Sequence, residues 1–129
     1  MQTATAGGTS TGSNLVWYNV DSVNDVVTVT WDDVQVYGAP TGNPLNAFQL
    51  RIIARPEGSS SAGSSFVYGA NTFDVEFRYE AINWVRGPAS SGDAGIGWDG
   101  GNGVNFLNVP GSLTAAAGTI DTAAQFGQP

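Results

Sequence analysis

The sequence contains no cysteine and no histidine. Without cysteine the chain can form neither a disulfide framework nor a thiolate metal site, and it has no cysteine nucleophile. Without histidine it lacks the commonest general base and the commonest ligand of transition metals. These absences remove the residue types on which many catalytic centres depend, so we predict that the chain is not an enzyme and has no catalytic residues.

Charged residues are also scarce, at 12% of the chain against about 25% in an average soluble domain. Lysine is absent, and 11 acidic residues against four arginines give a formal net charge of −7. Such a surface repels phosphate backbones and anionic lipid headgroups. No apolar run approaches the roughly 20 residues that are needed to cross a bilayer. We therefore expect neither nucleic-acid binding nor membrane insertion, whereas the binding of cations stays open.

The length of 129 residues fits a single domain, and a hydrophobic content of 41% can form one core. Residues 2–13 are small or polar and contain no side chain able to anchor a core, as is typical of a flexible linker. We therefore divide the chain into residues 1–13, a flexible linker or the remnant of a longer chain, and residues 14–129, a single β domain.

Aromatic and β-branched residues alternate with polar residues over much of this domain, which is the pattern of strands with one buried face. The clearest case is residues 73–80, where odd positions are aromatic or β-branched and even positions are charged. A change of phase at Asp32-Asp33 predicts a bulge or tight turn. The sequence predicts an all-β fold, an antiparallel β-sandwich or partly open barrel with at most one short helix near the C-terminus. The expected strands cover residues 15–20, 26–37, 48–52, 73–80 and about 104–109.

Several short motifs follow one another in the order of a known family. They are Asn46-Ala47-Phe48-Gln49-Leu50, then FRYEAINW at residues 77–84, then Ala94-Gly95-Ile96-Gly97, Asn105-Phe106 and Pro110-Gly111-Ser112. In this order and spacing they resemble the nidogen-like extracellular domain, in which an N-x-F-Q strand precedes an F-x-Y-x-x-I-x-W strand. The resemblance implies a β module of matrix and cell-surface proteins that lacks known catalytic residues.

The implied location is extracellular or at the cell surface, within a secreted protein whose signal sequence lies elsewhere. The implied role is cell adhesion in the extracellular matrix, through contacts with other extracellular proteins or glycans. Animal members of the family sit beside cysteine-rich modules, whereas this cysteine-free chain looks more like a bacterial surface or matrix protein. Two alternatives stay open: a self-associating subunit of an extracellular fibre or surface layer that uses its N-terminal strand, and a carbohydrate-binding module.

The glycine-rich loop at residues 93–103 contains the candidate site residues. Asp93, Asp99 and Asn102 are the candidate metal ligands, because Ca²⁺ takes about six to eight oxygen ligands in a flexible loop. Ca²⁺ is accordingly the one candidate cofactor. The loop does not match the EF-hand spacing, and a turn whose aspartates bond their own backbone is the alternative. Trp98 is the candidate ligand contact, since its place in the loop suits exposure.

Three carboxylates, Asp74, Glu76 and Glu80, lie at solvent-facing positions of one expected strand. Paired carboxylates could serve a glycosidase, which needs two carboxyl groups across the scissile bond. Arg78 lies among them, so a solvated cross-strand charge ladder is the simpler interpretation.

Overall fold

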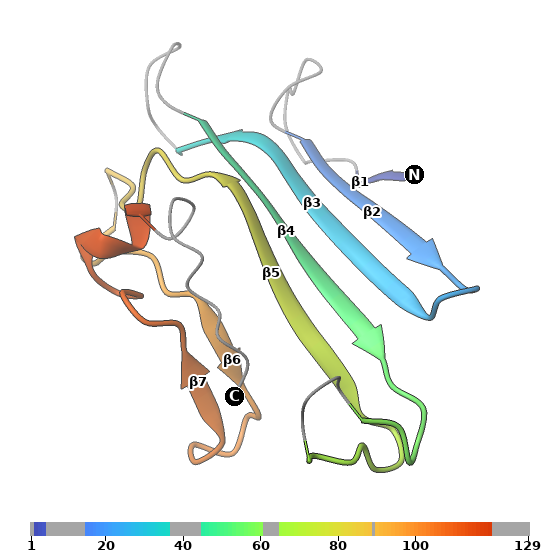
Figure 1. The fold of residues 1–129 in the computed structure, drawn as a ribbon. Coiled ribbons are helices and arrows are strands. Elements are labelled where there is room, and N and C mark those ends of the chain that lie inside the picture. The colour runs from blue at the N-terminus through green and yellow to red at the C-terminus, as the bar shows by residue number, and fades with distance from the viewer. Residues whose placement is uncertain (1, 5–14, 37–44, 61–64, 89, 120–129) are drawn as a thin grey trace. The chain divides into compact units, whose positions relative to one another are not determined.

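The computed structural model describes residues 2–4, 15–36, 45–60, 65–88 and 90–119. Its strands form a five-stranded sheet in the order β1-β2-β3-β4-β5 and a two-stranded sheet of β6 and β7 (Figure 1). The larger sheet consists of β1 (Gln2–Ala4), β2 (Leu15–Asp21), β3 (Val26–Gln35), β4 (Leu45–Ala54) and β5 (Phe73–Ala81). They are followed by β6 (Gly97–Asp99), β7 (Phe106–Asn108) and a 3₁₀ helix, η1 (Ala115–Thr119).

The register of β2 against β3 follows from the hydrophobic alternation. The two strands are antiparallel, with Tyr18 opposite Val29 and Val16 opposite Trp31. Because alternate residues of a strand point to opposite faces, this register gathers the apolar side chains on one face. Trp31 also stacks on Phe48 of β4, with ring centroids 5.0 Å apart and planes inclined by 15°. The apolar face therefore continues from β2 across β3 to β4.

The turn between β2 and β3 is closed by Asp21. Its Oδ1 accepts hydrogen bonds from the N–H groups of Val23 at 3.0 Å and Asn24 at 3.1 Å. The pKa of Asp21 is lowered, first by the hydrogen bond from the Asn24 side chain and then by these two N–H groups. Asp25 completes the turn with a φ of 53°, in the left-handed region that Asp adopts more readily than most residues.

The chain divides into two compact units. The first contains Met1–Asp32 and Phe48–Arg78, and the second contains Asp33–Ala47 and Tyr79–Pro129. The second unit has a small core of its own, in which Val109 and Ala117 are buried and Tyr79, Ile82, Val85 and Ile96 pack against them. Burial in this core raises the pKa of Tyr79 to about 12.

Asn46, near the start of β4, is buried and connects this strand to the segment that follows β5. Its Oδ1 accepts hydrogen bonds from the N–H groups of Asn83 at 2.7 Å and Trp84 at 3.1 Å, and its Nδ2 donates to the Trp84 carbonyl at 2.8 Å. The Trp84 indole in turn donates to the carbonyl of Val34 at 3.2 Å. Backbone groups that lie beyond the end of β5 therefore gain hydrogen bonds outside any sheet.

The structure confirms the all-β fold class: the described strands form antiparallel sheets, and these do not close into a barrel. Asp33, at the predicted change of phase, has a φ of 52°. Two strands lie where none was predicted, β1 within the expected linker and β6 within the expected loop. The short helix near the C-terminus is η1, and the other linker residues lie outside the described part of the chain.

None of the helical segments that the structure describes is long and apolar enough to span a bilayer.

Candidate functional site

The candidate site is the hairpin formed by β6 and β7 in the second unit. Trp98 lies opposite Leu107, and Gly97 lies opposite Asn108. A Cβ at Gly97 would lie 2.1 Å from the carbonyl oxygen of Leu107, so only glycine allows the two strands to approach as they do. The close pairing of the hairpin therefore depends on this glycine.

The turn of the hairpin is held by its own polar side chains. Asp99 Oδ1 accepts a hydrogen bond from the N–H of Gly101 at 2.6 Å. Asn102 Oδ1 accepts hydrogen bonds from the N–H groups of Val104 at 3.0 Å and Asn105 at 2.8 Å. These are the local hydrogen bonds by which Asp and Asn stabilise turns.

The base of the hairpin is anchored in the core of the second unit. The N–H of Ile96 donates to Ser112 Oγ at 2.6 Å, and the N–H of Val109 donates to the Ile96 carbonyl at 2.9 Å. Val109 is buried and Ile96 packs against it. The hairpin therefore extends from a fixed base.

Large apolar side chains of the hairpin are exposed to solvent: Trp98 is 46% exposed, Phe106 59% and Leu107 55%. Trp98 and Leu107 form a cross-strand pair and share one face, whereas Phe106, opposite Asp99, belongs to the other face by strand alternation. Trp98 and Phe106 also line an open groove of about 500 Å³ together with Ile96. Exposed apolar side chains gathered on one short element are typical of a protein contact surface.

The predicted metal ligands each have a partner of their own. Arg86 Nε donates to Asp93 Oδ1 at 2.9 Å, and Asp99 and Asn102 accept the N–H groups of their own turn. In the residues that the structure describes, no group of three or more acidic side chains is placed to hold a metal ion. Calcium binding by Asp93, Asp99 and Asn102 stays a prediction.

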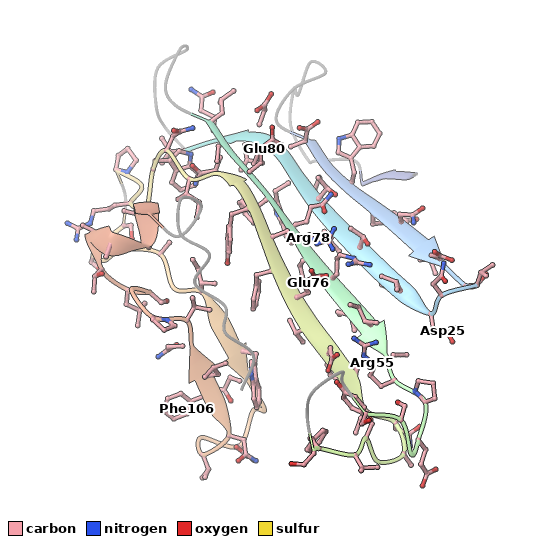
Figure 2. All side chains as sticks on the ribbon, viewed as in Figure 1. Asp25, Arg55, Glu76, Arg78, Glu80 and Phe106 are labelled. Carbon is pink, nitrogen blue, oxygen red and sulfur yellow. The ribbon has the colours of Figure 1, made fainter. Side chains whose placement is uncertain are left out.

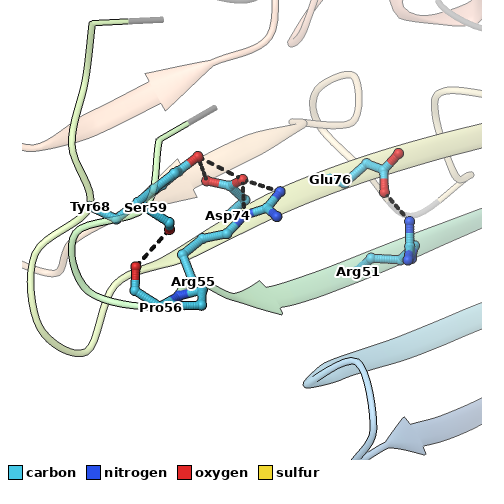
Figure 3. Close-up of polar contacts among 7 residues, drawn as sticks. All are labelled: Arg51, Arg55, Pro56, Ser59, Tyr68, Asp74 and Glu76. Atoms are coloured by element: carbon cyan, nitrogen blue, oxygen red, sulfur yellow. Dashed lines mark hydrogen bonds and ion pairs between the residues drawn. The ribbon is translucent and has the colours of Figure 1, made fainter. Parts of the chain in front are cut away.

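Asp74 on β5 pairs with Arg55 beyond the end of β4, in the first unit (Figure 3). Arg55 Nε donates to Asp74 Oδ2 at 2.7 Å, and the hydroxyl of buried Tyr68 lies 3.0 Å from both oxygens of the same carboxylate. The guanidinium lies 5.7 Å from the Tyr68 ring centroid. The hydrogen bond to Asp74 is the main reason that the pKa of Arg55 is raised.

Glu76, the next carboxylate along β5, lies between two arginines. Arg51 pairs with its Oε2, and Arg78 Nε donates to its Oε1 at 2.9 Å (Figures 2 and 3). Burial by itself would raise the pKa of Glu76, but the hydrogen bonds from Arg78 and Arg51 outweigh it, so this pKa is lowered. Asp74 and Glu76 are therefore both held in ion pairs with arginine, and Glu80 is exposed.

Sequence reasoning singled out Trp98 but not Phe106 and Leu107 as contact residues. A signal was present, because two short segments with apolar residues flank the turn-forming Gly-Gly-Asn-Gly at residues 100–103. Such flanks around a glycine-rich turn are typical of a hairpin.

Comparison with known proteins agrees with the sequence motifs that resemble the nidogen-like domain. The model of the nidogen-like domain family matches residues 17–129. Alpha-tectorin of Gallus gallus is 35% identical over 102 residues, which cover 72% of this chain, and alpha-tectorins of Mus musculus and Homo sapiens are 36% identical over 98 residues, or 69% of it. The chain spans only 4% of the length of these relatives, and no solved structure gives a significant match. The chain belongs to the nidogen-like domain family.

Proposed function

We propose that this chain is a non-catalytic module of the extracellular matrix that mediates adhesion by binding another extracellular protein through the β6–β7 hairpin. Membership of the nidogen-like family supports the matrix role. The observation that carries the proposed contact is the exposure of Trp98, Phe106 and Leu107 on one anchored hairpin. A few side chains near the centre of an interface, tryptophan among the commonest, contribute most of its binding energy.

The chemistry of the hairpin also defines its partner. Asp99 is the only charged residue of the hairpin at 97–108, so association gains little from ion pairs. The anchored base limits the ordering that binding requires, and this lowers its entropic cost. The partner is therefore a protein with an apolar groove or pocket, and the affinity depends only weakly on salt concentration.

Retention of the purified chain on a decellularised extracellular matrix tests the proposal. Replacing Trp98, Phe106 and Leu107 together by serine should reduce the bound fraction at least tenfold at both low and high salt. Val23→Ser is the matched control, because Val23 is an aliphatic residue of the first unit that is 89% exposed. Circular dichroism confirms that both variants are folded. Equal retention of the triple variant and the wild-type chain would contradict the proposal.

Self-assembly is a second candidate function, supported by the position of β1. This strand pairs antiparallel with β2, with Thr3 opposite Trp17, at the edge of the five-stranded sheet. The same pairing supplied by a neighbouring chain would link copies by strand addition. Light scattering after size exclusion should then show a mass that grows with concentration in the full chain and not after deletion of residues 1–13. A monomer at every concentration would contradict assembly.

The predicted cation site can be tested by thermal denaturation of the full chain. A rise in melting temperature on adding Ca²⁺, reversed by a chelator and lost in Asp99→Asn, would support ligation by Asp93, Asp99 and Asn102. An unchanged melting temperature at millimolar Ca²⁺ would contradict it.

A further inference from the structure

The polar face of the sheet in the first unit carries a hollow that the hairpin contact does not use. Trp17 of β2 lies opposite Thr30 of β3, and Gln49 Nε2 of β4 donates to Thr30 Oγ1 at 2.9 Å. These three side chains therefore form a row across neighbouring strands. The row lines a hollow of about 270 Å³, which we call the polar hollow.

A second row lies beside the first on the same face. Asn19 is opposite Thr28, and both line the polar hollow, as does Arg51. Arg51 pairs with Glu76, to which Arg78, another lining residue, also donates. Strands rather than loops thus hold every lining side chain, which fixes their spacing before a ligand arrives.

The lining of the polar hollow suits a ligand that is rich in hydroxyl groups. Its side chains supply hydroxyls, amides and guanidinium groups, and none of the lining residues is aliphatic. The indole ring of Trp17, on the same face as Thr30, adds flat apolar surface with a polar edge. The volume lies just below the roughly 300 Å³ at which pockets for drug-sized ligands begin, so the hollow has room for a single ring.

The two arginines that line the polar hollow favour a ligand that carries a negative charge as well as hydroxyl groups. The chain has a net charge of −7, yet two of its four arginines line the polar hollow beside a single carboxylate, Glu76. Arg78 uses Nε for that carboxylate, and its side chain is 54% exposed. Among the described residues, no hydrogen bond engages its two terminal nitrogens. The outer edge of a guanidinium binds a carboxylate through two parallel hydrogen bonds.

We infer that the polar hollow binds a carboxylate-bearing sugar residue of an extracellular glycan. The sugar carboxylate would pair with the terminal nitrogens of Arg78, and the ring hydroxyls would bond to Gln49 and the two threonines. The site lies within the first unit and does not depend on the proposed hairpin contact, so the triple serine variant of the hairpin keeps its sugar affinity.

Calorimetric titration of the full chain with three carboxylated probes tests the inference: hyaluronan oligosaccharides, oligogalacturonates and sialyllactose. At least one should bind, and Arg78→Gln should weaken that binding about ten- to hundredfold, the range for a hydrogen bond to a charged group. Arg86→Gln is the matched control, because this exposed arginine pairs with Asp93 in the second unit. Thr28→Val, which removes one hydroxyl at nearly constant volume, should weaken binding without changing the fold.

Three outcomes would overturn the inference. The first is that none of the three acidic probes binds. The second is that neutral chitooligosaccharides bind as tightly as the acidic ones, which would remove the role of the carboxylate. The third is that Arg78→Gln and Arg86→Gln lower the affinity equally, which would indicate attraction by overall charge rather than a site at the polar hollow.

Discussion

The side chain of Asn46 and the backbone of Trp84 bond to each other in both directions. Asn46 Nδ2 donates to the Trp84 carbonyl at 2.8 Å, and the Trp84 N–H donates to Asn46 Oδ1 at 3.1 Å, although the residues are 38 positions apart in the chain. An amide side chain offers both the acceptor and the donors that this arrangement needs. Asn46 therefore gives the backbone of the segment after β5 the hydrogen bonds that a neighbouring strand supplies inside a sheet.

Removing this amide should destabilise the fold strongly. Asn46→Ala leaves the N–H groups of Asn83 and Trp84 without their side-chain partner at a position that is 6% exposed. We expect the free energy of unfolding to fall by about 3 kcal/mol, in the range for buried polar groups that lose their partners. Urea denaturation followed by tryptophan fluorescence measures the change. Asn105→Ala, an exposed control, should change it by less than about 0.5 kcal/mol, and similar losses in both variants would contradict the role of Asn46.

Tyr68 and Asp74 should be energetically coupled. The Tyr68 hydroxyl lies 3.0 Å from both carboxylate oxygens, and Tyr68 is 7% exposed. Tyr68→Phe should lower the free energy of unfolding by about 1–2 kcal/mol in the wild-type background and by much less in an Asp74→Asn background. A double-mutant cycle by urea denaturation gives the coupling energy. Equal effects of Tyr68→Phe in the two backgrounds would show that the hydroxyl stabilises the protein through some other group.

Strands with strong alternation could be predicted from the sequence because alternation is a local property. Residues 73–80 show it over a full strand, and β5 forms there. β6 has only three residues, Gly97–Asp99, and lies among glycines, so no alternation can be recognised before the pairing with β7 is known. β6 was therefore predicted as part of a loop, with Trp98 as its one contact residue, whereas β7 lies within the strand expected at about residues 104–109.

The partners of the charged residues could not be predicted, because they depend on the register between distant strands. Asp74 and Glu76 were placed in a charge ladder with Arg78 of their own strand. In the structure Asp74 also pairs with Arg55, which follows the end of β4 and is 19 residues away in the sequence. Glu76 also pairs with Arg51 of β4, which is 25 residues away. The motif containing Asn46 was recognised, yet its hydrogen bonds to Asn83 and Trp84 follow only from the fold.

Tyr79 should make the fold sensitive to alkali. Burial raises the pKa of Tyr79 from 10.0 to about 12, so the unfolded chain ionises first as the pH rises. The contribution of the neutral phenol to stability is complete below pH 10 and is lost between pH 10 and about 12, by at most about 1.4 kcal/mol per pH unit. Urea midpoints across this range should fall more steeply for the wild-type chain than for Tyr79→Phe. Parallel curves would show that Tyr79 titrates alike in the folded and unfolded chain.

Gly97→Ala should open the hairpin without unfolding the rest of the chain. The new Cβ would lie 2.1 Å from the Leu107 carbonyl oxygen and 3.1 Å from its carbon, so backbone rather than a flexible side chain must move. Amide hydrogen exchange at residues 97–108 should accelerate, and retention on matrix should fall to that of the triple serine variant. Gly69→Ala is the control, because a Cβ at Gly69 would meet no atom within 4 Å beyond its two neighbours in the chain. If Gly97→Ala exchanges rapidly and is still retained like the wild-type chain, matrix binding does not need the paired hairpin. Slow exchange in this variant would instead contradict the requirement for glycine at this position.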